Sequence, residues 1–192
     1  MSKLATFLTH LKIEAAAEQA LLEVWTIHKT LSRNDFLIQS GQLGRYLYFV
    51  KKGTFRIFYP LEHNDAVVGF GYPNTLLFDY PSFVKDRPSP FAIQALSKSE
   101  VIGIHRGDFL KIKDQFPLFR NQWHKLTEQA LLGRIEREID LITPSPKARY
   151  ERLINRSPHV FQLFPHKYIA SYLRMTPETL SRLKKEIKPI KG

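Results

Sequence analysis

The segment 178–185 concentrates side chains whose chemistry suits recognition of base pairs. Arg182 can donate two hydrogen bonds to a guanine edge, and Glu178 can accept one from a cytosine amino group or orient the arginine. Thr179 and Ser181 are neighbouring candidates on the same outward surface. Because such donors and acceptors distinguish base pairs in the major groove, these four residues are our candidates for reading DNA bases.

A second group of side chains can hold the DNA backbone. Lysines and helix N-termini bind phosphates, which supplies affinity but little sequence information. The candidate phosphate contacts are His166, Lys167, Thr176, Lys184 and Lys185.

Two short helices would have to position these residues. A proline at Pro165 suits the start of the first helix, and Thr176 followed by Pro177 suits an N-cap and first position of the second. A small residue at Ala170 lets the two helices cross closely. We therefore predict a helix-turn-helix over about residues 166–185, although a helical hairpin with a basic exterior is the competing interpretation. The predicted inward residues are Ile169, Leu173, Leu180 and Leu183.

The charge distribution favours a polyanionic partner at the C-terminal end. Residues 143–192 carry 11 Lys and Arg against 3 Asp and Glu, a net charge of +8. The other 142 residues carry 18 against 15, a net charge of +3. A nearly balanced body with a basic tail is typical of a nucleic-acid-binding segment, although a solvated basic surface would give the same count.

Upstream, the pattern changes from helical to β and back. The first thirty residues read as helical, and several short strands are predicted between about 36 and 105, which suggests an antiparallel sandwich or barrel. A short helix over 108–115 and a long one over about 118–142 follow. Because Thr143-Pro-Ser-Pro breaks the chain, we divide it into 1–116, 117–142 and 143–192.

The long helix carries two apolar stripes. One has the spacing of a coiled-coil seam and the other faces elsewhere. Two stripes indicate two partners, namely the chain's own domain and a second subunit, although burial in one large core is the alternative. The first stripe is Phe119, Trp123, Leu126 and Ala130, and the second is Leu132, Ile135, Ile139 and Ile142.

The run Ile169-Ala-Ser-Tyr-Leu followed by Thr176-Pro-Glu-Thr-Leu-Ser-Arg resembles the reading head of the Crp/Fnr family of bacterial regulators. The resemblance extends over nearly the whole chain in the order of its elements. It implies an α+β fold, in which an N-terminal antiparallel β-roll with flanking helices, of the double-stranded jelly-roll type, leads into a long dimerisation helix and a C-terminal winged helix-turn-helix. In one departure, Arg174 stands at the turn position usually held by glycine, which implies left-handed backbone strain of about 1 kcal/mol.

The same resemblance implies that Glu178 and Arg182 match the family's base-reading glutamate and arginine. It implies a homodimer that reads a roughly palindromic operator in double-stranded DNA, with RNA polymerase as a further candidate partner. We therefore expect a sequence-specific transcription regulator in the cytoplasm, with no membrane association, no metal and no cofactor.

The resemblance also bears on the effector-binding part of the chain. Members of the family that bind cyclic AMP use a glutamate and an arginine in a short β-roll cassette. Aligned on Ala95-Leu96, the position of that arginine becomes Ser89, and Asp79 is the nearest acid. A buried phosphate would then lack a cation, so we do not expect cyclic AMP. The candidate pocket residues for an unknown small-molecule effector are Asp79, Arg87, Ser89 and Phe91.

Other function classes are less well supported. The seven histidines show no i, i+4 pair for a metal, and no nucleophile elbow, P-loop or dinucleotide motif is present, so we do not expect an enzyme. The aromatic residues of the strand region suit a β-roll core better than a platform for single strands. The alternative function is a small-molecule or cyclic-nucleotide sensor module whose basic C-terminal part contacts a protein or a membrane surface.

Overall fold

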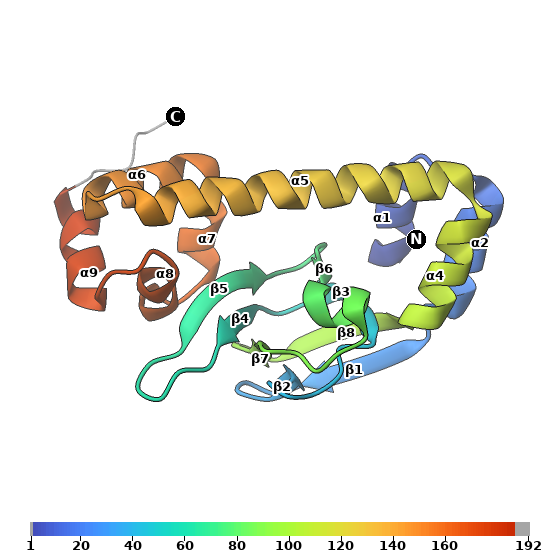
Figure 1. Cartoon of the computed structure of the whole chain (residues 1–192), viewed down its shortest axis with the longest axis horizontal. Coiled ribbons are helices and arrows are strands. Elements are labelled where there is room, and N and C mark those ends of the chain that lie inside the picture. The colour runs from blue at the N-terminus through green and yellow to red at the C-terminus, as the bar shows by residue number, and fades with distance from the viewer. Residues whose placement is uncertain (1, 187–192) are drawn as a thin grey trace.

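The computed structural model describes residues 2–186 of the chain. Two helices open it, and eight strands with one short inserted helix follow (Figure 1). These elements are α1 (Lys3–His10), α2 (Ala15–Val24), β1 (Ile27–Leu31), β2 (Phe36–Ile38), β3 (Tyr46–Lys52), β4 (Phe55–Tyr59), β5 (Ala66–Gly71), β6 (Leu76–Leu77), α3 (Tyr80–Lys85), β7 (Ala92–Ala95) and β8 (Ser99–His105).

The eight strands form two four-stranded antiparallel sheets, with the orders β1-β8-β3-β6 and β2-β7-β4-β5. Side chains of both sheets pack against each other in one core. Its fully buried members include Tyr48, Val50, Phe55, Ile93 and Ala95. Of the two predicted arrangements, an antiparallel sandwich or a barrel, the structure has two packed antiparallel sheets, and β5 lies at an edge of its sheet.

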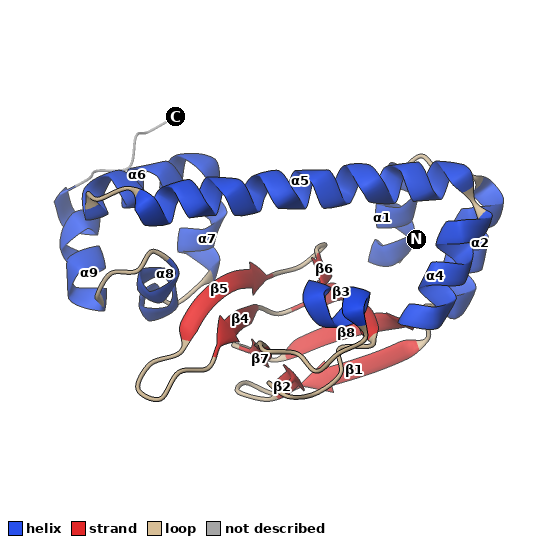
Figure 2. Cartoon of the chain, in the orientation of Figure 1, coloured by secondary structure: helices blue, strands red, loops and turns tan. Residues whose placement is uncertain are grey.

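The other face of the first sheet is covered by helices. Strand β3 is buried on both faces, because Leu47 and Phe49 point away from Tyr48 and Val50. Leu47 and Phe49 belong to a second core with α1, α2 and the first two helices after β8. Figure 2 shows α1, α2 and the helix over Arg106–Gln115 gathered at one end of the sheets.

The start of the chain differs in part from the prediction. Residues 27–30 were predicted as the end of a helical segment, but they lie in β1. This strand pairs with β8 from Ile27 opposite Gly103 to Leu31 opposite Ser99. A partner some seventy residues downstream in the sequence thus decides the conformation, which local propensity cannot register.

Six helices follow β8, and the longest spans the molecule. Helix α5 runs from the N-terminal helices to a cluster of four short helices at the other end (Figure 1). The six are α4 (Arg106–Gln115), α5 (Pro117–Ile142), α6 (Pro146–Arg156), α7 (Pro158–Leu163), α8 (His166–Tyr172) and α9 (Pro177–Glu186). We call α6–α9 the C-terminal head. Between residues 106 and 186 there is no strand, so the expected β-wing is not formed by this part of the chain.

No helix within residues 2–186 has both the length and the apolar character that crossing a membrane would require.

Candidate nucleic-acid interface

Helices α8 and α9 pack through a small apolar core. Ile169 and Ala170 of α8 are completely buried, and Leu180 and Leu183 of α9 are at most 5% exposed. These residues lie in one cluster with Leu173, as their helical spacing predicts. The prediction of two closely crossing helices with these inward residues is confirmed.

The turn between the two helices contains the strained residue that the sequence indicated. Arg174 has a φ of 53°, in the left-handed region that favours glycine. Backbone hydrogen bonds hold the turn, from the Arg174 nitrogen to the Ser171 oxygen at 3.2 Å and from the Met175 nitrogen to the Ala170 oxygen at 3.0 Å. The guanidinium of Arg149 adds a contact to the Arg174 oxygen at 3.4 Å.

Thr176 caps the second helix, as predicted. Its hydroxyl accepts from the backbone nitrogen of Thr179 at 3.2 Å, and α9 begins at Pro177. The backbone N–H of Glu178 and then the Thr176 hydroxyl lower the pKa of the Glu178 carboxyl. Glu178 is therefore ionised at neutral pH and can only accept hydrogen bonds.

The outward face of α9 presents the predicted base-reading residues to solvent. Glu178, Ser181 and Arg182 are exposed, and Lys185 lies on the same side. Thr179 differs from the other three, because it is half-buried and its hydroxyl lies 3.2 Å from that of Thr176. Its side chain therefore takes part in the cap, which leaves three freely exposed polar side chains for a base edge.

Two of the candidate phosphate contacts, His166 and Lys184, lie next to each other. Lys184 Nζ lies 3.2 Å from His166 Nε2, so the start of α8 and the end of α9 meet at these side chains. Burial, and then the charge of Lys184, lowers the pKa of His166, which keeps its imidazole neutral at pH 7. Lys167 Nζ lies over the Tyr168 ring, 4.9 Å from its centroid, and Lys185 is exposed.

A buried carboxylate ties the head to the long helix. Asp140 near the end of α5 is completely buried, and Arg152 and Arg156 of α6 surround it. Arg152 Nε donates to Asp140 Oδ1 at 2.7 Å, and Arg152 also reaches Glu136 at 2.7 Å. The hydrogen bond to Asp140 raises the pKa of the Arg156 guanidinium. The network fixes how α6 leaves α5.

The head also contacts the free edge of β5. The Ser171 hydroxyl of α8 accepts from the Val67 nitrogen at 3.1 Å and donates to the Asp65 oxygen at 2.9 Å. Beside this contact, the centroid of the Phe70 ring lies 4.2 Å from the ring centroid of Phe164 and 5.3 Å from that of Tyr172. Strand edges offer unpaired backbone groups, and here a side chain of the head satisfies two of them.

Two arginines of α5 reach the same strand. Arg134 Nη1 donates to the Val68 oxygen at 2.6 Å, and Arg137 Nη2 donates to the Val67 oxygen at 3.2 Å. The guanidinium of Arg137 also lies over the Tyr172 ring of α8 at 4.8 Å. Strand β5 is therefore the place where the sheet, the long helix and the head meet.

The two apolar stripes of α5 have different surroundings. Phe119 and Trp123 belong to the chain's own core with the N-terminal helices, so the expectation of a coiled-coil seam along the first stripe is wrong. Ala130, its last member, is exposed. The second stripe is exposed throughout, with fractions of 62% for Leu132, 48% for Ile135, 38% for Ile139 and 71% for Ile142. This second stripe is an apolar surface of the helix that no described part of the chain covers.

The candidate effector residues form a closed turn. Asp79 and Ser89 are each 2% exposed, and the Ser89 hydroxyl contacts the Asp79 carboxylate. Asp79 also caps α3 by accepting from the Ser82 nitrogen at 3.0 Å, and burial raises its pKa against that hydrogen bond. The Phe91 nitrogen donates to the Ser89 hydroxyl at 2.9 Å. The structure therefore brings Asp79, Ser89 and Phe91 together.

Arg87 takes no part in this cluster through its side chain. Its carbonyl oxygen accepts from the Ser82 hydroxyl, while the side chain is exposed. The polar groups of Asp79 and Ser89 are paired with each other, and neither supplies the cation that a bound phosphate would need.

Residues 28–116 match the family model of the cyclic nucleotide-binding domain. The match begins in β1 and ends after α4, so it covers both sheets. A 95-residue stretch is 32% identical to the voltage-gated inwardly rectifying potassium channel KCNH6 of Rattus norvegicus, and it makes up 48% of this chain. The chain spans 10% of the length of that channel.

Solved structures resemble the chain over most of its length. A mutant of CooA from Carboxydothermus hydrogenoformans superposes with a TM-score of 0.70 at 15% identity, covering 86% of this chain and 77% of that one. FixK2 from Bradyrhizobium japonicum gives a TM-score of 0.70 at 16% identity and covers 83% of both chains. The antiparallel sheets with flanking helices therefore form a fold shared with these proteins.

Sequence reasoning missed the contacts that connect the matched domain to the head. Ser171 was not singled out, although it lies on α8 next to the inward-facing Ala170. Phe70 and Tyr72 were assigned to the β-roll core, but they pack against the head. The Asp140 network did leave a signal, because Arg152 and Arg156 are four residues apart and share one helix face.

Proposed function

We propose that this protein is a dimeric, sequence-specific DNA-binding transcription regulator of the Crp/Fnr type. The outward face of α9 carries the proposal, because its exposed Glu178, Ser181 and Arg182 stand on a helix whose inner face is buried. A capped helix N-terminus and the lysines beside it supply phosphate contacts. We propose α8 and α9 as a helix-turn-helix, with α9 as the helix that enters the major groove.

The exposed stripe of α5 supports the dimer. Four neighbouring aliphatic side chains at spacings of three and four residues form a surface that a second copy of the same helix can cover. A two-fold dimer places two reading heads on one duplex, so the operator has two related half-sites. RNA polymerase is a further proposed partner.

The proposed effector is a small molecule other than cyclic AMP. The contact between Asp79 and Ser89 supports this, because both polar groups are already paired and the side chain of Arg87 is exposed. The match to the cyclic nucleotide-binding domain supports the alternative, a sensor module whose basic part contacts another surface. Titration of the protein with cyclic AMP tests the effector proposal, because saturable binding would contradict it. Binding to a duplex DNA, which only the regulator requires, separates the two functions.

Selection of bound duplexes from a random DNA pool tests the proposal directly. The purified chain is expected to enrich one motif with two inverted half-sites about one helical turn apart. Recovery of unenriched sequences would contradict specific binding, and enrichment of a single unpaired half-site would contradict the dimer.

A further inference from the structure

The turn between α8 and α9 contains a residue whose backbone conformation costs stability. Arg174 has a φ of 53°, in the left-handed region that residues with a Cβ disfavour. Within residues 2–186, five residues other than glycine have a positive φ, and three of them are Asn or Asp, which tolerate it. The two exceptions are Lys12 and Arg174. A glycine at either position would remove this strain.

The internal contacts of Arg174 do not explain why the residue is not glycine. Its backbone nitrogen donates to the Ser171 oxygen at 3.2 Å, and its backbone oxygen accepts from the Arg149 guanidinium at 3.4 Å. Glycine would supply the same two backbone groups. The Arg174 side chain is exposed, and it forms no hydrogen bond or ion pair with residues 2–186. Its guanidinium is therefore accessible to a partner outside the chain.

The charge of Arg174 is also unfavourably placed in the free protein. Arg137 of α5 lies over the Tyr172 ring, which is two residues before Arg174 in the chain. Burial is the largest cause that lowers the pKa of the Arg137 guanidinium, and the charges of Arg134 and Arg174 lower it further. Tyr172 and Glu138 act in the opposite direction. The cations around the turn therefore repel one another.

The neighbouring arginines have internal partners that account for their positions. Arg152 and Arg156 face a buried carboxylate, and Arg134 and Arg137 donate to backbone oxygens of β5. The Arg174 side chain has neither kind of partner among the described residues. A residue that keeps both strain and repulsion without an internal contact suggests a function that needs its charge.

We propose that Arg174 contacts a phosphate of the DNA backbone at the edge of the groove that α9 enters. This inference rests on the proposed function. Arg174 stands two residues before Thr176, which caps α9, and the chain just before a helix in the major groove lies beside the phosphates that border the groove. The exposed guanidinium needs no cavity, and a phosphate supplies the anion that these cations lack.

Replacement of Arg174 by glycine should change stability and DNA binding in opposite directions. Arg174→Gly relieves the strain and the repulsion, so the midpoint of thermal unfolding should rise by about 2 °C. Affinity for operator and random duplexes should fall alike, by about tenfold for each half-site. The slope of log affinity against log salt should decrease by about 1 for each half-site. Thermal denaturation and fluorescence anisotropy at several salt concentrations measure these changes.

Lys12→Gly is the matched control. Lys12 has a φ of 52°, is exposed, and lies between α1 and α2, which Figure 1 shows at the end of the molecule opposite to the head. The control removes the same charge and the same kind of strain far from α9. Its unfolding midpoint should rise similarly, and its DNA affinity should stay within about twofold of the parent, because solvent screens a distant charge.

Two further variants separate the charge of Arg174 from the shape of the turn. Arg174→Lys keeps a cation and the strain, so it should retain the salt dependence and most of the affinity. Arg174→Asn removes the charge with a residue that tolerates the left-handed region, so it should lose affinity as glycine does, even if glycine loosens the turn. An equal loss of affinity in Arg174→Lys and Arg174→Gly would overturn the proposal.

The parent chain distinguishes failure of this inference from failure of the proposed function. If the parent binds DNA and both Arg174→Gly and Arg174→Asn bind equally well, the phosphate contact is wrong and the proposed function stands. If the parent binds no duplex, both are wrong.

Discussion

The Ser171 hydroxyl lies 3.1 Å from the Val67 nitrogen and so joins α8 of the head to the free edge of β5. The same hydroxyl donates to the Asp65 oxygen at 2.9 Å, so one side chain satisfies two backbone groups of one strand edge. Aromatic packing between Phe70 and Phe164 continues this contact. The helix that supports the proposed reading helix is thus held against the sheet by a small number of specific interactions.

Replacing Ser171 by alanine should destabilise the protein. Val67 is completely buried, so its nitrogen would lose its partner without gaining water. We expect the free energy of unfolding to fall by about 1–2 kcal/mol, the usual worth of two such bonds. Urea denaturation measures this. Ser181→Ala on the exposed face of α9 is the control and should change stability by no more than about 0.5 kcal/mol. Equal effects of the two variants would contradict the bridging role.

Asp140→Asn should weaken the junction between α5 and α6. The Asp140 side chain is 1% exposed and faces two arginines, whose side chains are 36% and 28% exposed. Because solvent screens these partly exposed arginines, we expect a loss of about 2 kcal/mol, below the full cost of breaking a buried ion pair. Thermal and urea denaturation measure it. Glu151→Gln removes an acid from an exposed pair with Lys147 at 4.0 Å and should be nearly neutral.

The elements of the head could be predicted because their signals are local. Pro177 and the Thr176 cap mark the start of α9, and the spacing of Leu180 and Leu183 gives its inward face. The strand β1 could not be predicted in this way, because pairing with β8 determines it. The choice between the two stripes of α5 also depends on tertiary packing, since both have helical spacing and only the structure shows which one the N-terminal helices cover.

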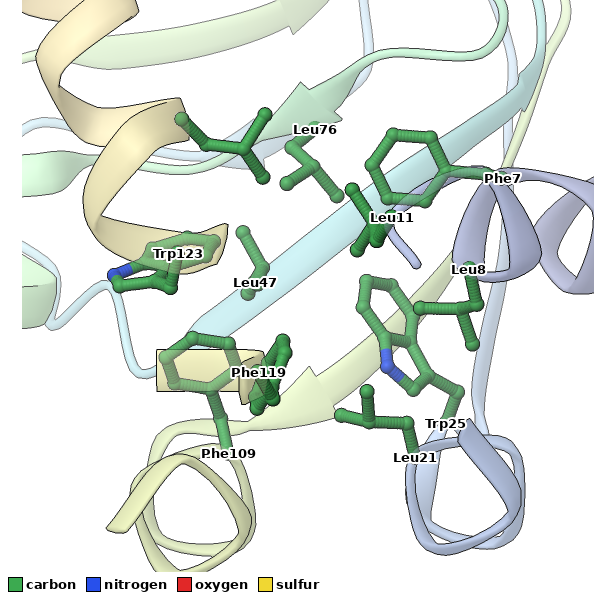
Figure 3. A pocket seen from close by; sticks show the side chains of 11 residues that line it. Phe7, Leu8, Leu11, Leu21, Trp25, Leu47, Leu76, Phe109, Phe119 and Trp123 are labelled. Atoms are coloured by element: carbon green, nitrogen blue, oxygen red, sulfur yellow. The ribbon is translucent and has the colours of Figure 1, made fainter. Parts of the chain in front are cut away.

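In the candidate effector turn, too, part of the arrangement could be predicted from the sequence and part could not. The sequence placed Ser89 where a cation would be needed, and the structure adds that Asp79 contacts it and that both are buried. The direction of the Arg87 side chain could not be inferred, because the surrounding prolines give no periodic pattern. The small apolar pocket that Trp25 and ten other side chains line (Figure 3) left no signal in the sequence, because these residues come from six separate elements and two connecting segments.

Lys184→Gln should raise the pKa of His166. Burial is the larger cause of the lowered value and Lys184 the second, so removal of the lysine charge restores part of the shift. A lowered pKa in the folded state means that stability falls as the pH drops below the unfolded value near 6.5. This loss should be smaller in the variant. Nuclear magnetic resonance titration of the imidazole measures the pKa. Lys185→Gln is the control, because it removes the same charge from a lysine that does not contact His166. A pKa that stays the same in Lys184→Gln would contradict the contact.

Leu132→Glu and Ile139→Glu should each prevent dimerisation. Both side chains are exposed on the second stripe of α5, and an ionised carboxylate cannot be buried between two apolar helix faces without a partner. We expect a dimer for the parent chain and a monomer for each variant by sedimentation at micromolar concentration. Gln129→Glu adds the same charge at an exposed position outside the stripe and should leave the dimer intact. A monomeric parent chain would show the dimer proposal to be wrong.

Arg182→Ala and Lys185→Ala should affect DNA binding in different ways. Both residues are exposed on α9, but a bidentate arginine reads a base, whereas a lysine neutralises a phosphate. Arg182→Ala should cost about 1–3 kcal/mol on the selected operator and relax specificity at one base pair in each half-site. Lys185→Ala should weaken operator and random DNA alike and reduce the slope of log affinity against log salt by about 1 for each half-site.

Fluorescence anisotropy on operator and random duplexes at several salt concentrations separates the two variants. Since Glu178 is ionised and four residues from Arg182, Glu178→Gln should change the preferred base at the same position without changing the salt dependence. If Arg182→Ala lowered affinity for both duplexes equally, the arginine would be a phosphate contact. The base-reading assignment on the outward face of α9 would then be wrong.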